Sequence, residues 1–312
     1  LNLYNSHCVK DTFEFVEKLR DANFESSGFM CSYDVVSLFT NVPLRETIDI
    51  CATTLYHNKS ITPPSLNETE FVKLMLMVTS GVEFSFGNVM YKQIDGVAMG
   101  SPLGPVLANI FVGFCEASIS PSLWPSMYCR FVDDVYCHDE DEDVCGTFLL
   151  TLNSLHPALR FTSEAEQNGR LSFLDVQISR NINTKSLDTT IYRKPTFTGL
   201  YIPWGSYTPT KSKKHLVKAL VYRAHRICSP HLLQDELDRL TSIFTNNGYP
   251  KEFLAKLINE KPVTDKPIQF GPDRCPVVLR LPWVGAGSAR VEKDVRGIVC
   301  PSYPCVKLYV IF

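Results

Sequence analysis

The sequence lacks any long hydrophobic run, internal repeat or low-complexity segment. No apolar stretch approaches the roughly 18 residues that a membrane-spanning helix needs, and the first residues show no signal-peptide pattern. We therefore expect no membrane partner. Of the 312 residues, 45% are apolar and 21% are charged, which is typical of a globular chain that can bury a core and hold more than one subdomain.

Paired cysteine spacings are also missing. The 11 cysteines are scattered, and the nearest two, Cys300 and Cys305, have no histidines at a matching spacing. The sequence therefore predicts no structural zinc site, and the odd number of cysteines disfavours a disulfide framework. We interpret them as reduced thiols of an intracellular protein.

Acidic residues are absent between Thr189 and Gln234, although the whole chain has a net charge of only −2. The cations of this stretch are Arg193, Lys194, Lys211, Lys213, Lys214, Lys218, Arg223 and Arg226. Aromatic side chains are interleaved with them, and residues 211–226 have the apolar periodicity of a helix. Cations and aromatic rings together favour contact with phosphates and bases. We predict nucleic-acid binding here, with a solvated basic helix as the alternative.

Two adjacent carboxylates, Asp133 and Asp134, stand between short apolar runs that are typical of β-strands. The pattern predicts a hairpin with both acids at its turn, where like charges are costly unless a cation balances them. A third carboxylate, Asp34, lies near the end of a predicted strand over 29–35. Taken singly, each acid is more often a solvated turn or strand-end residue. Together they could clamp the two metal ions, roughly 3.5–4 Å apart, that nucleotidyl transfer uses.

A glycine-rich loop runs from Gln93 to Pro105, with Gly96, Gly100 and Gly104 at every fourth position. Glycines allow the backbone to approach a ligand closely, and the N-terminus of the helix that follows attracts anionic groups. A base pair and a triphosphate fit such a loop. Its spacing matches neither a Walker loop nor a dinucleotide-binding fingerprint.

Local patterns predict further elements. We expect a helix over 43–56, a helix capped by Asn67, and a hairpin around Gly87-Asn88. Helices are predicted at 143–155, 230–246 and 250–259, and the acidic run 139–143 is assigned to a helix start with no role in a site. Segments 159–163 and 171–179 are predicted as paired strands, with Asp175 in a turn or at the core edge.

Three segments in this order resemble the palm of a reverse transcriptase, and more narrowly that of the Penelope-like retroelement family. They are DVVSLFTNVP at 34–43, DGVAMGSPLGP at 95–105 and RFVDD at 130–134. Shorter matches at 161–164, 171–176 and 192–196 extend the resemblance over most of the chain. Met99 departs from the glutamine that many other reverse transcriptases have there, so only backbone roles carry over to that position.

The resemblance implies an α+β fold, in which a right-hand polymerase palm with an antiparallel sheet and packed helices is followed by a mostly helical thumb. It implies a palm at 1–185 with a remnant of the fingers, a basic thumb at 186–265 and a C-terminal extension or linker at 266–312. Fingers segments normally precede such a palm, and a GIY-YIG nuclease domain often follows the thumb. We expect both to be missing from this chain.

The resemblance also implies roles for single residues. Asp34, Asp133 and Asp134 correspond to the catalytic carboxylates, with the Val35 carbonyl as a further metal ligand. Phe39 corresponds to the aromatic residue that collides with a ribose 2′-hydroxyl and so selects deoxynucleotides; the alternative is an ordinary core aromatic. Met99 and Gly100 correspond to the substrate pocket, and the cations from 193 to 226 to the part that follows the duplex backbone.

We therefore expect an RNA-directed DNA polymerase of a retrotransposon. It would use two Mg²⁺ ions, replaceable by Mn²⁺, and no small-molecule organic cofactor. Its partners would be an RNA or DNA template with a primer, and deoxynucleoside triphosphates; the habits of the family imply a nuclear location. A truncated, catalytically inactive fragment that only binds nucleic acid is the alternative. An RNA-templated RNA polymerase is disfavoured by the aromatic side chain at position 39.

Overall fold

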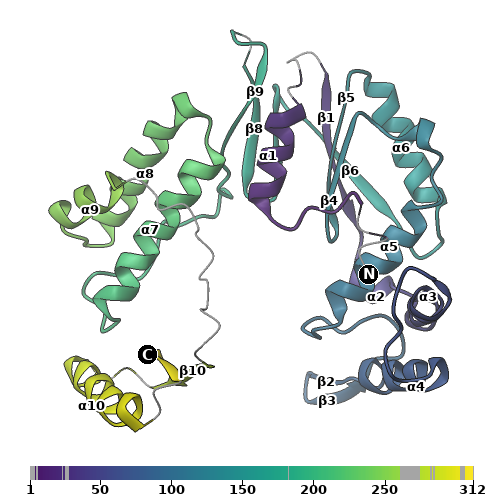
Figure 1. Ribbon diagram of the computed structural model, residues 1–312. Coiled ribbons are helices and arrows are strands. Elements are labelled where there is room, and N and C mark those ends of the chain that lie inside the picture. Colours follow the sequence, from purple (N-terminus) through teal and green to yellow (C-terminus); the bar gives the residue numbers. More distant parts are fainter. Residues whose placement is uncertain are drawn as a thin grey trace. The chain divides into compact units, whose positions relative to one another are not determined.

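The computed structural model describes residues 4, 6–22, 24, 28–181, 183–260, 275–281, 283, 285–302 and 306–311. The chain forms two compact units, residues 1–192 and 193–312, whose helices and strands are labelled in Figure 1. Among the described residues, no helix combines the length and the apolar character that crossing a membrane would require.

The first unit is built on a four-stranded antiparallel sheet with the order β4-β5-β1-β6. Its strands are β1 (Phe29–Val35), β4 (Met127–Phe131), β5 (Asp134–Asp139) and β6 (Phe161–Ala165). Because side chains alternate between the faces of a strand, Tyr33 and its partner Val135 lie on one face, and Asp34 and its partner Asp134 on the other. The order of the strands thus brings residues about a hundred positions apart into direct register.

Helices α5 (Gly104–Glu116) and α6 (Glu142–Ser154) cover one face of this sheet (Figure 1). Phe111 of α5 and Phe148 of α6 belong to the same buried cluster as Tyr33. On the other face, helix α1 (Thr12–Ala22) packs its Phe15 edge-on against Tyr136 of β5, at 5.1 Å between ring centroids. Asp34 and Asp134, farther along the same face, remain exposed.

Between β1 and α5 the chain forms α2 (Leu38–Asn41), α3 (Leu44–His57), α4 (Glu68–Thr79), β2 (Glu83–Phe86) and β3 (Val89–Lys92). The predicted cap of α4 is confirmed, because Asn67 and Glu70 form a reciprocal capping box. The predicted hairpin is confirmed too, since β2 pairs with β3. Its turn residues Gly87 and Asn88 both have positive φ, as a type I′ turn requires.

A second sheet in this unit has the order β7-β8-β9. Its strands are β7 (Arg170–Phe173), β8 (Val176–Asn181) and β9 (Ser186–Ile191). The prediction of one strand over 171–179, paired with 159–163, is wrong: Leu174 has φ +53° and turns the chain, and β6 pairs with β1 instead. The turn position predicted for Asp175 is confirmed, and its carboxylate accepts a 2.5 Å hydrogen bond from the Thr12 hydroxyl.

The second unit contains α7 (Thr210–Ile227), α8 (Leu233–Asn246) and α9 (Lys251–Ile258). Apolar side chains one helical turn apart, such as Val217 and Val221 of α7, form its buried side. Farther along the chain, β10 (Cys275–Arg280) and β11 (Val306–Ile311) pair in parallel, with α10 (Ala286–Ser302) between them in sequence. The first part of the predicted C-terminal extension, 266–274, lies outside the described residues.

Short 3₁₀ helices complete the described elements: η2 (Pro121–Leu123) and η3 (Pro230–Leu232). Each begins at a proline, whose fixed φ suits the first position of a helix. Mixed helices and antiparallel sheets in the first unit and a helical start to the second agree with the predicted α+β class.

Candidate active site

The three predicted carboxylates lie at one end of the first sheet, although their oxygens do not all lie within 4.8 Å of one another. Asp34 and Asp134 are direct partners in the β1–β5 ladder, so their Cβ atoms are about 4.5–5.5 Å apart on one face. The prediction that both adjacent acids occupy the hairpin turn is wrong for Asp134, which is the first residue of β5. Asp133 lies in the β4–β5 turn, where its carbonyl accepts a 3.1 Å hydrogen bond from the backbone N–H of Val35. Burial and then the charge of Asp133 raise the pKa of the Asp34 carboxyl above its ordinary value. Like charges placed opposite one another destabilise a sheet unless a cation balances them.

The turn that holds Asp133 adopts an unusual backbone conformation. Val132 has φ +59° while Asp133 does not have positive φ, which is the pattern of a type II′ turn whose first central residue is normally glycine. A β-branched residue in the left-handed region costs on the order of 1–3 kcal/mol and persists only where its surroundings hold it in place. The surrounding contacts of this turn are therefore part of the site.

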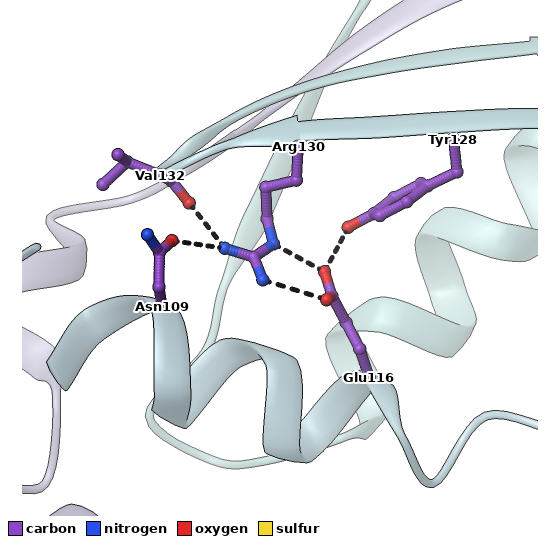
Figure 2. Close-up of polar contacts among 5 residues, drawn as sticks. All are labelled: Asn109, Glu116, Tyr128, Arg130 and Val132. Carbon is purple, nitrogen blue, oxygen red and sulfur yellow. Dashed lines mark hydrogen bonds and ion pairs between the residues drawn. The ribbon is translucent and has the colours of Figure 1, made fainter. Parts of the chain in front are cut away.

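A buried arginine donates a hydrogen bond to the backbone of the turn (Figure 2). Arg130, 0% exposed, donates from Nη1 to the carbonyl of Val132 at 3.2 Å and to Asn109 Oδ1 at 2.8 Å. Its Nε and Nη2 donate to the two carboxylate oxygens of Glu116 at 2.7 and 3.0 Å. The Tyr128 hydroxyl donates to the same carboxylate at 2.6 Å. This network ties the turn to helix α5.

The guanidinium of Arg130 stays protonated despite its burial. Burial lowers the pKa of the guanidinium, but the charge and hydrogen bonds of Glu116 outweigh it and raise the pKa above its ordinary value. A planar guanidinium in contact with two carboxylate oxygens also has a fixed orientation. Arg130 is therefore a rigid support that aims one N–H at the turn.

The sequence predictions did not include Asn109, Glu116 or Tyr128 as parts of the site. One signal was available: a charged residue at position 130 inside an apolar strand must face either solvent or a buried partner. Which partner it has depends on the packing of α5 against β4, and no short-range pattern reports that. Thr162 was missed because its place depends on the pairing of β6 with β1, which no short-range pattern reports either. It is the β6 partner of Asp34, and its hydroxyl lies 3.4 Å from the Asp34 carbonyl.

The glycine-rich loop docks on the segment that follows β1. The N–H of Val97 donates to the carbonyl of Phe39 at 2.7 Å. Gly96 has φ +78°, and a Cβ at this position would lie 2.6 Å from the carbonyl oxygen of Thr40. Only glycine combines that conformation with so close an approach, so Gly96 allows the two motifs to meet.

The predicted substrate-pocket residues have different surroundings. Phe39 is half-buried and packs against the core, and its ring would lie 3.4 Å from a Cβ added at Gly104. Met99 is 73% exposed, and Gly100 has φ +94° with open space where a side chain would project. Phe39 is thus in contact with the loop, while Met99 and Gly100 face solvent.

Two of the predicted nucleic-acid-binding cations form hydrogen bonds or ion pairs within the second unit. Lys213 is 5% exposed, and its ammonium donates to the carbonyls of Trp204 and Ser206 at 2.5 and 2.7 Å. Arg193 forms a buried, two-pronged ion pair with Glu236. This geometry argues against the predicted phosphate contacts of Lys213 and Arg193, because neither charge can leave its internal partner without a large penalty.

The other predicted cations lie nearer the surface. Lys194 and Lys211 are exposed and Lys214 is half-buried, whereas half-buried Lys218 pairs with Glu260. Arg226 donates to the Tyr222 hydroxyl at 2.7 Å. Burial lowers the pKa of the Arg223 guanidinium, which is half-buried on the same helix. Helix α7 therefore still carries several cations at or near its surface.

Comparisons with known proteins give one family match and several structural similarities. Residues 200–259, which contain α7, α8 and α9, match the family described as the animal helix-turn-helix domain. No curated protein sequence matches the chain. Telomerase from Candida albicans, solved with a TWJ fragment of telomeric RNA, is similar with a TM-score of 0.55 at 12% identity, covering 79% of this chain and 46% of that one.

Two further solved structures are similar at lower scores. Apo telomerase from Candida tropicalis has a TM-score of 0.48 at 11% identity, covering 83% of this chain and 48% of that one. The Sicinivirus 3Dpol RNA-dependent RNA polymerase has a TM-score of 0.42 at 14% identity, covering 78% of this chain and 52% of that one.

The similarity to the Candida albicans telomerase defines the fold as that of a right-hand nucleic-acid polymerase, which confirms the predicted fold class. In this chain, the three carboxylates lie at the end of the central sheet where β1 ends and β5 begins. This chain spans less than half the length of that telomerase.

Proposed function

We propose that this chain is the palm and thumb part of an RNA-directed DNA polymerase of the Penelope-like retroelement class. The observation that carries the proposal is the meeting of Asp34, Asp133 and Asp134 at one end of the sheet of a right-hand polymerase fold. Burial, and then the charge of the Asp133 carboxylate, raise the pKa of the Asp34 carboxyl above its ordinary value. Carboxylates gathered at one end of a sheet are suited to binding hard cations.

The donor set fits Mg²⁺ because hard cations of this kind prefer carboxylate and carbonyl oxygens. Asp34, Asp133 and Asp134 would hold the ions, and the carbonyl of Val35, the last residue of β1, would be a further ligand. When bound, two Mg²⁺ ions polarise the primer 3′-hydroxyl and neutralise charge on the triphosphate. The Arg130 network keeps Asp133 in position for this role.

The chain's own residues would also select the substrate. Phe39, held against the glycine-rich loop through the Val97 N–H, would limit the space at the sugar and so disfavour a 2′-hydroxyl. Exposed Met99 and Gly100 would offer backbone contacts to the incoming deoxynucleotide. Surface cations of α7, with Lys194, would contact the phosphates of the template and primer.

The test is extension of a DNA primer on an RNA template with Mg²⁺ and one deoxynucleotide at a time. We expect incorporation only of the nucleotide that is complementary to the template, and none after chelation of Mg²⁺. A folded chain that binds the duplex but adds no nucleotide would contradict the polymerase proposal.

That same result would support a second candidate function, a fragment that binds nucleic acid without catalysis. The match of residues 200–259 to the animal helix-turn-helix family favours it, as do the cations near the surface of α7. Binding through these cations should weaken steeply as salt increases. Duplex binding and primer extension must therefore be measured on the same preparation.

A further inference from the structure

Three buried cysteines from three different elements meet between the sheet and its helical layer. Cys31 of β1, Cys137 of β5 and Cys145 of α6 are 3%, 0% and 2% exposed. Their Sγ atoms all lie within 4.8 Å of one another, and those of Cys137 and Cys145 are 3.6 Å apart. In the described part of the chain, no other three His, Cys, Asp or Glu side chains are so placed.

The spacing of the sulfurs suits a metal–thiolate site. Zinc binds thiolate sulfur at about 2.3 Å, so three sulfurs around one zinc ion are about 3.8–4.0 Å apart. The Cys137–Cys145 separation of 3.6 Å is slightly below that value, and no sulfur pair exceeds 4.8 Å, so only small movements of the side chains are needed. Cys31 and Cys137 are direct partners in the β1–β5 ladder, which fixes their separation before any ion binds.

The chemistry of the donors selects the kind of ion. Thiolates are soft ligands and favour Zn²⁺ and other thiophilic d¹⁰ ions over Mg²⁺. The Tyr33 hydroxyl donates to the Cys145 carbonyl at 2.9 Å, which keeps this hydroxyl beside the thiols.

We propose that Cys31, Cys137 and Cys145 form a buried site for one thiophilic metal ion of the Zn²⁺ class. The ion would join β1, β5 and α6. Cys31 and Cys137 each lie three residues from a carboxylate of the candidate active site, Asp34 and Asp134, so the ion would stabilise the two strands that carry these carboxylates. It would be distinct from the Mg²⁺ site in ligand chemistry and in the face of the sheet that it occupies, and it does not depend on polymerase activity.

The site is tested by titrating the reduced, metal-stripped full chain with Cd²⁺, which gives an ultraviolet charge-transfer band only when thiolates bind it. We expect the band to saturate at one ion per chain and Zn²⁺ to abolish it by competition. Cys145→Ala and Cys31→Ala should each lose the band. The matched control is Cys51→Ala, which removes an equally buried cysteine (3% exposed) of α3 and should leave the band unchanged.

A second measurement on the wild-type chain covers the case in which a variant does not fold. Zn²⁺ should slow alkylation of the three clustered cysteines, located by mass spectrometry, and leave the alkylation rate of Cys51 unchanged. The proposal is overturned if no band appears, if the band persists in Cys145→Ala or Cys31→Ala, or if Zn²⁺ affects all four cysteines equally.

Discussion

Replacing Arg130 by methionine tests whether the buried network supports the turn that carries Asp133. The change keeps most of the side-chain volume but leaves the Glu116 carboxylate buried, with the Tyr128 hydroxyl as a remaining donor. Removing one partner of a buried ion pair costs about 3–5 kcal/mol. For a unit of roughly this size, 1 kcal/mol corresponds to about 2–4 °C in Tm. We therefore expect Arg130→Met to lower the Tm of the first unit by about 6–20 °C.

The double variant Arg130→Met/Glu116→Leu separates a buried charge from a general packing defect. It removes both charges, and buried ion pairs can often be replaced by apolar side chains at little cost. The Tyr128 hydroxyl loses its acceptor, which costs about 1–3 kcal/mol. The double variant should therefore be more stable than Arg130→Met alone. As a control, Arg45→Met breaks the exposed Arg45–Asp49 pair and should cost about 0–1 kcal/mol.

Thermal unfolding of the full chain, followed by circular dichroism and by calorimetry, measures these differences. Glu116→Leu alone is measured beside them. If Arg130→Met costs no more than Arg45→Met, or if the losses of Arg130→Met and Glu116→Leu add up in the double variant, then the Arg130 network does not support the turn.

Three further predictions follow from the site and from the second unit. Gly96→Ala should lose at least twice as much stability in urea unfolding as Gly100→Ala, because both glycines have positive φ but only Gly96 has a backbone oxygen where the Cβ would project; equal losses would refute the close approach. Because the pKa of Asp34 is raised in the folded chain, its contribution to stability is present at low pH and is lost as the pH rises through that pKa. Asp34→Asn should flatten this part of the pH profile, and the rise in Tm caused by Mg²⁺ should be larger at neutral than at acid pH; an identical rise at both would count against the carboxylate site. Lys213→Met should lower the Tm without changing the salt dependence of duplex binding, whereas Lys211→Met should reduce the slope of log K against log salt by about 1 at unchanged Tm. The reverse pattern would show that Lys213, not Lys211, contacts phosphate.

Short-range signals in the sequence predicted several local features of the fold correctly. The capping box at Asn67, the Gly87-Asn88 turn and the β4–β5 hairpin, though not the place of Asp134 in it, each depend on residues only a few positions apart. Their physical causes are hydrogen bonds and φ preferences within that short range. Helix α1 was not predicted, although Phe15 and Leu19 have the spacing of its buried face.

Features that depend on packing between distant segments could not be predicted in this way. The pairing of β1 with both β5 and β6 determines which carboxylates become neighbours, and it is also what brings Cys31 to Cys137. The expectation that the cysteines are scattered thiols considered only their spacing along the chain. Lys213 resembles a surface cation in the sequence, but the loop at Trp204 encloses its ammonium. Such contacts follow from the tertiary fold.

Comparison of Asp133→Asn with Glu140→Gln in single-nucleotide incorporation tests the central claim most directly. Both variants remove one negative charge, but Asp133 lies in the β4–β5 turn and Glu140 is exposed in the neighbouring acidic run. With an RNA template, a DNA primer and Mg²⁺, the wild-type chain and Glu140→Gln should incorporate the complementary deoxynucleotide at similar rates. Asp133→Asn should bind the duplex with the same affinity and incorporate none. Incorporation by Asp133→Asn at the wild-type rate would contradict a catalytic role for the carboxylate cluster.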